Sequence, residues 1–319
     1  MMFKAIQIIA RRLFPAGKSE PESRVTLFRY MEEHICSLYQ CGQYRTAETY
    51  RATLNRLCRF RDGKDLCLDE LDAAMLQQYE SYLKQEGLCP NTVSFYLKRL
   101  RAIYNKAVEE GMAPDSHPFR KVSTTSEKTV KRAIPLSTIR KLKNLNLDDS
   151  PSRRLARDMF LLSFYMRGMS FVDMAHLRKA DLKGGVLSYR RRKTGQFLAM
   201  RWEPCMQELA QCYASSSSSP YLLSIIPDAD GDTIRRYHAV QTRVNRYLKE
   251  IGETIGLSQP LTMYVARHSW ASIARKEGIP LSVISEGMGH DSESTTQIYL
   301  ASLESSVIDN ANRKILNSL

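Results

Sequence analysis

Hydrophobic residues recur every three or four positions in four consecutive stretches between residues 24 and 111. This spacing places them on one face of a helix, so each stretch predicts an amphipathic α-helix. Gly42, Gly87 and Gly111 follow three of the stretches and indicate where those helices end. The stretches cover residues 27–38, 50–57, 71–83 and 93–104. Because short segments connect them, we expect a packed four-helix bundle.

The polar positions of this predicted bundle are rich in arginine and lysine. Basic side chains along helices are suited to contact the phosphates of a nucleic acid. Charge that simply faces water is the alternative at each position. The candidates for phosphate contacts in this region are Arg45, Arg51, Lys98, Arg99 and Arg101.

The helical pattern stops over residues 114–133, where proline, serine, threonine and basic residues replace the apolar repeat. This composition predicts a basic linker between a first domain over 22–113 and a second domain over 134–319. Residues 1–21 mix isoleucine with lysine and arginine, and we interpret them as a basic N-terminal arm. Its apolar run is too short to span a membrane.

The second domain is predicted to be mainly helical with a small β-sheet. Two short apolar runs at 186–189 and 197–200 flank a turn around Lys193 and Gly195, which predicts a β-hairpin. The expected helices cover about 137–145, 152–166, 234–255, 263–277 and 281–288, with a C-terminal helix through residues 307–316. The fold class is therefore mainly α, with a helical first domain and a mixed, mostly helical second domain.

The amino-acid composition favours a polyanionic binding partner. The 319 residues carry 47 lysines and arginines against 34 acidic residues, a net charge of +13. Nucleic acid is the leading candidate, although a basic protein without such a partner would have the same charge. The seven cysteines contain no CxxC pair, which favours reduced thiols in a cytoplasm over a disulfide framework or a zinc site.

The most informative motifs lie near the C-terminus. The segment from Tyr264 to Trp270 reads YVARHSW, Gly289 and His290 follow, and Tyr299 ends the segment TTQIY. In order and spacing these motifs resemble the phage-integrase family of tyrosine recombinases, whose signature ends in Gly-His and a Tyr nine residues after that His. The helical first domain resembles the SAM-like core-binding domain of that family, so the resemblance covers nearly the whole chain.

The resemblance implies that Tyr299 is the nucleophile, because it stands nine residues after His290. A phenol has a pKa of about 10 in water, so it needs cationic neighbours and a proton acceptor to attack at neutral pH. A half-buried structural tyrosine is the alternative interpretation. His290 matches the family histidine that hydrogen-bonds the phosphate or assists proton transfer, and a helix-capping histidine is the alternative for it.

Two arginines are expected to hold the phosphate oxygens. Arg267 matches the second family arginine, and Arg167 is the choice for the first. Counting back strictly from Leu177 would place the first family arginine at Ser170, but Arg167 lies one helical turn earlier on the same face. Asp173 is expected to support a guanidinium.

Lys193 stands at the turn of the hairpin, where the family places a lysine that acts as general acid for the departing 5′ oxygen. Arg190, Arg191 and Arg192 precede it, and a merely basic hairpin that touches DNA is the alternative; Arg191 and Arg192 are candidates for DNA contacts. Tyr264 is the clearest departure, because many members carry histidine there. We expect Tyr264 to be a supporting residue, with simple packing as the alternative.

The implied activity is metal-independent breakage and rejoining of DNA through a 3′-phosphotyrosyl intermediate, without a cofactor. It predicts double-stranded DNA as the partner, a homotetramer on paired sites and a cytoplasmic location with no membrane association, and leaves open an accessory DNA-bending protein. Integration, excision and inversion are the expected outcomes. A DNA-binding regulator with weak catalysis and a topoisomerase-like enzyme that nicks and reseals one duplex are the alternatives.

Overall fold

The structure is a computed structural model, and it describes residues 25–125, 127, 132–225, 233–290, 292, 294, 296 and 316. The chain divides into two compact units, Met1–Lys128 and Thr129–Leu319. The predicted N-terminal arm over 1–21, Tyr299 and nearly all of the predicted C-terminal helix lie outside the described residues. The mainly helical fold with a small antiparallel sheet is confirmed.

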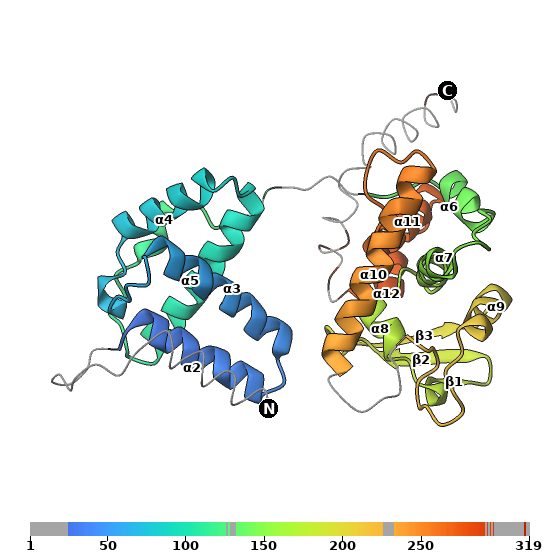
Figure 1. Ribbon diagram of the computed structural model, residues 1–319, viewed down its shortest axis with the longest axis horizontal. Helices are drawn as coiled ribbons and strands as arrows, with labels where there is room; N and C mark the ends of the chain where they lie inside the picture. The colour runs from blue at the N-terminus through green and yellow to red at the C-terminus, as the bar shows by residue number, and fades with distance from the viewer. Residues whose placement is uncertain are drawn as a thin grey trace. The chain divides into compact units, whose positions relative to one another are not determined.

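Unit 1 contains the helices that the apolar repeat predicts (Figure 1). Their apolar faces form one core in which Phe28, Tyr79 and Tyr104 are almost fully buried. Phe119 and Val122, inside the stretch predicted as a linker, also pack into this core. The elements are α2 (Leu27–Gln40), α3 (Tyr44–Phe60), η1 (Leu68–Glu70), α4 (Ala73–Gln85), α5 (Pro90–Glu109) and η2 (Pro118–Lys121).

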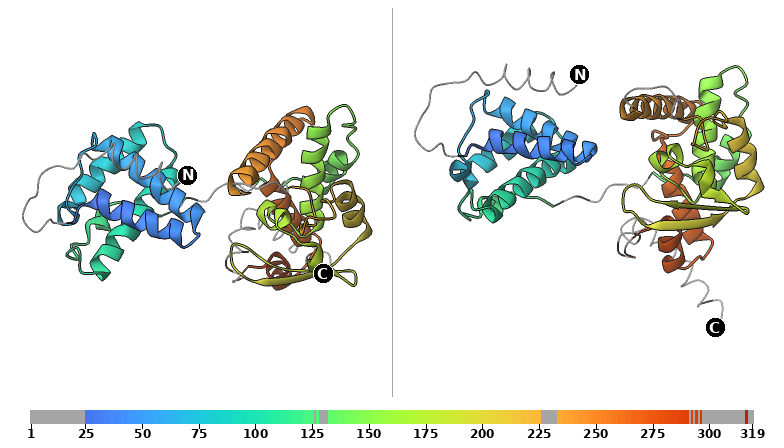
Figure 2. Two further views of the ribbon diagram at one scale, coloured as in Figure 1. Left: turned by 60° about the horizontal axis from the view of Figure 1, so that its bottom comes forward. Right: turned by 90° about the horizontal axis from the view of Figure 1, so that it is seen from below.

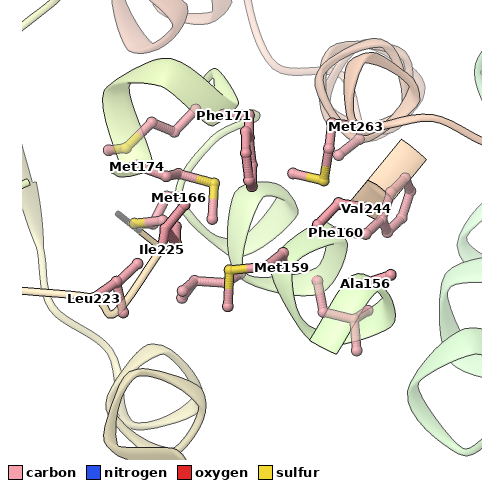
Figure 3. Close-up of a cluster of buried hydrophobic side chains, with 14 of the residues drawn as sticks. Ala156, Met159, Phe160, Met166, Phe171, Met174, Leu223, Ile225, Val244 and Met263 are labelled. Carbon is pink, nitrogen blue, oxygen red and sulfur yellow. The ribbon is translucent and has the colours of Figure 1, made fainter. Parts of the chain in front are cut away.

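Unit 2 is built around α7 (Pro151–Tyr165), which packs against α6, α9, α10 and α11. Figure 3 shows Met159 and Phe160 of α7 in one cluster with Phe171 of α8, Val244 of α10 and Met263 of α11. A helix that is buried on several sides in this way holds its C-terminal end in a fixed position. The other helices are α6 (Leu136–Lys143), α8 (Phe171–Ala175), η3 (Lys179–Asp181), α9 (Pro204–Cys212), α10 (Thr233–Thr254), α11 (Met263–Lys276) and α12 (Leu281–Met288).

The sheet of unit 2 has three antiparallel strands in the order β1 (Leu182–Lys183), β2 (Val186–Arg190) and β3 (Phe197–Arg201). Lys183 pairs with Val186 across a two-residue turn, Gly184-Gly185, in which both φ angles are positive. Such a turn requires residues that adopt positive φ, which glycine does without strain. The predicted hairpin of β2 and β3 is present, and Figure 2 shows it as one twisted ribbon.

Side chains alternate between the two faces of this hairpin. On β2, Leu187 and Tyr189 are buried, whereas Val186 and Arg190 are exposed. The buried face packs on the unit 2 core, as expected for an antiparallel sheet whose other face is exposed to solvent. The alternation therefore aims every second side chain of the hairpin toward the helices.

In the part of the chain described above, no helix combines the length and the apolar character that crossing a membrane requires.

Candidate active site

The candidate site begins at the turn after α7. Met166 caps the helix, and Arg167 and Gly168 then both adopt positive φ, +58° and +72°. A non-glycine residue in this region stores about 1 kcal/mol or more of backbone strain. Neighbouring hydrogen bonds hold the turn, including one from Ser163 Oγ to Met169 O at 2.7 Å. The surrounding turn thus holds the backbone of Arg167 in a strained conformation.

Gly168 lies directly against Arg267 of α11. An ideal Cβ atom on Gly168 would lie 2.5 Å from the Cα atom of Arg267, so only glycine permits this approach. Arg267 is 6% exposed, and its Nη1 donates a hydrogen bond to Gly168 O at 3.0 Å. The turn at Arg167-Gly168 therefore lies directly against Arg267, the other predicted arginine.

Arg267 also fixes the end of α12. Its Nη2 donates to Met288 O at 2.6 Å and lies 3.0 Å from Nε2 of His290. A guanidinium has only donors, so Nε2 of His290 accepts and the ring proton is on Nδ1. Nδ1 then donates to Thr296 Oγ1 at 2.7 Å, and Thr296 is fully buried. His290 is thus held as a neutral imidazole with its basic nitrogen toward Arg267.

Arg191 enters the same site from the end of β2. It continues the buried positions of the strand, is 8% exposed, and its Nη1 donates to the carbonyl of Gly289. Gly289 has a φ of +64°, and a Cβ atom there would lie 2.8 Å from Cδ of Arg191. Sequence reasoning placed Arg191 among surface DNA contacts, whereas the structure places it inside, beside the residue that precedes His290.

Asp173 is the buried carboxylate of the site. Its side chain is 1% exposed, accepts a hydrogen bond from Ser170 Oγ at 2.6 Å and another from the Arg192 N–H at 2.9 Å, and lies 4.0 Å from Arg191 Nε. Asp173 therefore joins α8 to the hairpin. Ser170, the strict counterpart of the first family arginine, caps α8.

Tyr189 is a neighbour of the site that sequence reasoning did not single out. Burial raises the pKa of its hydroxyl, and Asp173 adds to the rise while the cations Arg191, Arg267 and Arg167 oppose it. All four charged groups are therefore close to one phenol. The alternation of the hairpin, which turns Tyr189 inward, is the signal by which it could have been found.

The remaining predicted residues lie at the edge of this group or outside it. Lys193 and Arg192 are exposed at the hairpin turn. Tyr264 is 57% exposed, and its ring lies edge-on to His268 at 4.6 Å. Arg167 is half-buried, with Nη1 3.4 Å from Ala199 O of β3. Tyr299 falls outside the described residues.

The basic candidates of unit 1 differ in their surroundings. Lys98 and Arg101 are exposed, and Arg101 lies 3.4 Å from Thr124 Oγ1. Arg99 lies over the rings of Tyr50 and Phe95, each 5.5 Å from the guanidinium carbon. The two other candidates are paired with acids, Arg45 with Glu48 and Arg51 with Glu32.

The site as a whole gathers cations around the C-terminal end of α12. Among the described residues, Arg167, Arg191 and Arg267 lie near Tyr189 together with one buried carboxylate, Asp173, which is 4.0 Å from Arg191 Nε. Guanidinium groups fit the oxygens of phosphate in a bidentate manner, and an unprotonated imidazole nitrogen such as Nε2 of His290 accepts a proton. This arrangement is suited to bind a phosphodiester and to stabilise the charge that develops during attack on phosphorus. No group of three or more metal-ligating side chains occurs within the described ranges.

Comparison with known families agrees with these features. A Phage integrase SAM-like domain model matches residues 26–124, and a Phage integrase family model matches residues 158–306. Among curated relatives, tyrosine recombinase XerC of Thermodesulfovibrio yellowstonii is 26% identical over 272 residues, covering 80% of this chain and 85% of the relative. Tyrosine recombinase XerA of Thermococcus kodakarensis is 26% identical over 72% of this chain and 77% of the relative.

Solved structures show the same fold at lower identity. A lambda integrase dimer bound to a COC′ core site superposes with a TM-score of 0.66 at 17% identity, covering 93% of this chain and 85% of that chain. XerH recombinase bound to a palindromic difH substrate gives 0.63 at 16% identity, covering 83% and 79%.

Proposed function

This chain belongs to the tyrosine recombinase, or phage integrase, family, which breaks and rejoins DNA strands, and we propose that it is a site-specific recombinase using Tyr299 as its nucleophile. The observation that carries the proposal is that Arg167, Arg267 and His290 lie together at the C-terminal end of α12, and Tyr299 follows His290 by nine residues. These groups supply phosphate binding and proton transfer next to a tyrosine that the family pattern selects.

In the proposed first step, Tyr299 Oη forms a bond to the scissile phosphorus and the bond from phosphorus to the 5′ oxygen breaks. The guanidinium groups of Arg167 and Arg267 hold the non-bridging oxygens and stabilise the added negative charge. His290 accepts the phenol proton through Nε2, and Lys193 protonates the departing 5′ oxygen. The products are a 3′-phosphotyrosine and a free 5′ hydroxyl.

In the second step a 5′ hydroxyl from a partner strand attacks the phosphotyrosine and releases Tyr299. One phosphodiester is consumed and one is formed, so no nucleotide triphosphate is needed. Tyr264 supports the phosphate through its hydroxyl, and Asp173 holds the hairpin that carries Lys193. The exposed basic residues of unit 1, with Arg192 of the hairpin, contact the DNA backbone.

We further propose that the active assembly is a homotetramer on two paired sites in the cytoplasm. Support comes from lambda integrase, which has been solved as a dimer on a core site and as a tetramer on a Holliday junction. Strand exchange between two sites in such an assembly yields integration, excision or inversion. The cysteines, all seven of which lie in the described residues, are free thiols.

The test uses nicked suicide duplexes drawn from DNA that flanks the gene of this protein. A nick close to the scissile bond lets the cleaved fragment diffuse away, so a covalent protein–DNA band survives denaturant. We expect the band with the native chain and with Tyr264→Phe, and no band with Tyr299→Phe.

Other outcomes separate the alternatives. DNA binding without a band from the native chain supports a regulator, and a band that survives Tyr299→Phe identifies a different nucleophile. Relaxation of supercoils without any product that joins two sites supports a topoisomerase-like enzyme.

A further inference from the structure

Arg191 is the residue whose placement goes beyond the family pattern. Where that pattern, counted back from Leu177, places an arginine, this chain has Ser170, and the Ser170 hydroxyl donates to Asp173. The guanidinium that lies beside Asp173 is Arg191, delivered from the end of β2. An arginine from a different element therefore occupies the interior of the site.

The burial of Arg191 is unusual for its residue type. Among the described residues, Arg191 and Arg267 are the arginine or lysine residues with less than 9% exposure, and both lie in this site. Burying a guanidinium is costly unless hydrogen bonds and an opposite charge offset the loss of water. Asp173 supplies one negative charge against Arg191, Arg267 and the nearby Arg167. The described site thus carries surplus positive charge, which an oxyanion would neutralise.

Arg191 and Arg267 donate hydrogen bonds to adjacent backbone carbonyls at the C-terminal end of α12. Arg191 donates to the carbonyl of Gly289, and Arg267 donates to the preceding carbonyl, that of Met288. The two guanidinium groups therefore bracket the peptide that leads into His290. A guanidinium carries five N–H bonds, and the contact of Arg191 with Gly289 uses one of them.

The neighbours of Arg191 provide a comparison within the same hairpin. Arg190 points to the other face, where it stacks over Phe197 at 5.8 Å and its Nη1 lies 3.2 Å from Gly195 O. Arg192 is exposed at the turn. Of the three consecutive arginines, the alternation of the strand brings only Arg191 to the buried face.

We infer that Arg191 is a catalytic residue that binds a non-bridging oxygen of the scissile phosphate together with Arg267. This role rests on the proposed function, since it concerns the same phosphodiester. It makes Arg191 the third phosphate-binding arginine and assigns to the hairpin a task beyond carrying Lys193.

The first experiment measures binding of inorganic phosphate by the DNA-free full chain, using thermal unfolding over a series of phosphate concentrations at constant ionic strength. Arg190→Gln removes the same charge from an exposed position on the other face of the hairpin and is the matched control. We expect Arg191→Gln to weaken phosphate binding about 10- to 100-fold, the effect of losing a charge-assisted hydrogen bond, and Arg190→Gln to change it little. Equal affinity in both variants would overturn the inference.

The second experiment separates phosphate contact from positioning. The nicked duplex is prepared with either phosphate or uncharged methylphosphonate at the position that the native chain cleaves. We expect Arg191→Gln to slow adduct formation about 100- to 1000-fold on phosphate and less than about 10-fold on methylphosphonate, because the neutral linkage lacks the charge that Arg191 binds. A residue that only positions His290 would slow both equally, and that result would contradict the inference.

Arg191→Lys keeps the charge but not the planar fork, and it replaces Arg191→Gln in both experiments if the latter does not fold. We expect it to retain part of the phosphate affinity and to show a smaller difference in rate loss between the two linkages than Arg191→Gln would. If the native chain forms no adduct, the proposed function fails, whereas the phosphate-binding comparison still decides whether Arg191 binds an oxyanion.

Discussion

At the scale of single residues, the closest approach in the site is that of Gly168 to Arg267. A methyl group on Gly168 would meet the backbone of Arg267 at 2.5 Å, and the φ of +72° is unfavourable for alanine. We expect Gly168→Ala to lower the free energy of unfolding by about 2–4 kcal/mol, since strain and overlap add. Urea or thermal unfolding of the purified chain measures this loss.

Gly185 provides the matched control for that substitution. Its φ is +73°, but nothing lies within 4 Å of a Cβ atom there. Gly185→Ala should therefore cost only the backbone strain, about 1 kcal/mol. Equal losses in the two variants would show that the contact with Arg267 adds nothing to the effect.

Thr296 illustrates a positioning role at the residue scale. Its hydroxyl accepts the Nδ1 proton of His290 and so keeps Nε2 as the basic nitrogen. We expect Thr296→Val, which has a similar shape, to slow formation of the covalent adduct about 10- to 100-fold, because the ring loses its preferred orientation and tautomer. The readout is the rate of adduct formation on the nicked duplex as a function of pH.

Thr296→Ser keeps the hydroxyl and should restore most of the rate. If both variants react as the native chain does, the orientation of His290 does not depend on Thr296. If both fail while the chain remains folded, the site needs the methyl group of Thr296 as well as its hydroxyl.

Sequence reasoning at this scale is specific where the spacing between motifs carries the information. The positions of Arg267 and His290 follow from motifs, and the structure places the two side chains 3.0 Å apart. The interior position of Arg191 was missed because three consecutive arginines give no local sign of which one turns inward. Counting the alternation onward from Leu187 and Tyr189 would have selected Arg191, but that requires the strand register.

At the scale of elements, the long amphipathic helices are predictable because their apolar repeat is strong. Helices α2 to α5 agree with the predicted stretches, and so do the two long strands of the hairpin. Strand β1 has only two residues, too few to show an alternating pattern, and α9 was not predicted either. Phe119 and Val122 are isolated apolar residues whose burial depends on tertiary contacts with unit 1.

His176 links two elements of unit 2 and predicts a pH dependence of stability. It follows α8, its Nδ1 lies 2.8 Å from Val172 O, and its ring lies against those of Tyr221 and Tyr237. Burial lowers the pKa of His176 below its usual value of 6.5, with Arg192 contributing in the same direction. The folded chain therefore binds this proton less readily than the unfolded chain.

The sign of the effect follows from linkage. Because the pKa is lowered in the folded state, the stabilisation is fully present above pH 6.5 and is lost as the pH falls through and below that value. We expect His176→Gln to flatten the fall in unfolding free energy between about pH 7 and pH 5, measured by urea unfolding at each pH. An unchanged slope would mean that other groups dominate the acid sensitivity of unit 2.

At the scale of the whole molecule, the net charge of +13 predicts how DNA affinity responds to salt. Each phosphate that the protein neutralises releases bound counterions, so the logarithm of the affinity falls linearly with the logarithm of the salt concentration. For about six to ten phosphate contacts, we expect a loss of about 10³- to 10⁵-fold between 50 and 200 mM salt. Binding of the full chain to a labelled duplex across this range measures the slope.

Single substitutions then show how much each basic residue contributes to the slope of affinity against salt concentration. Arg101 is exposed on α5 and is one of the predicted phosphate contacts, so Arg101→Gln should reduce the slope by about 1. Arg29 is also exposed, but it is paired with Glu33 at 3.1 Å and is not a predicted contact, so Arg29→Gln should leave the slope unchanged. Equal effects of both substitutions would point to a diffuse attraction by net charge. A flat salt response of the native chain would instead contradict phosphate contacts altogether, since a protein that displaces no counterions has no reason to lose affinity as salt is raised.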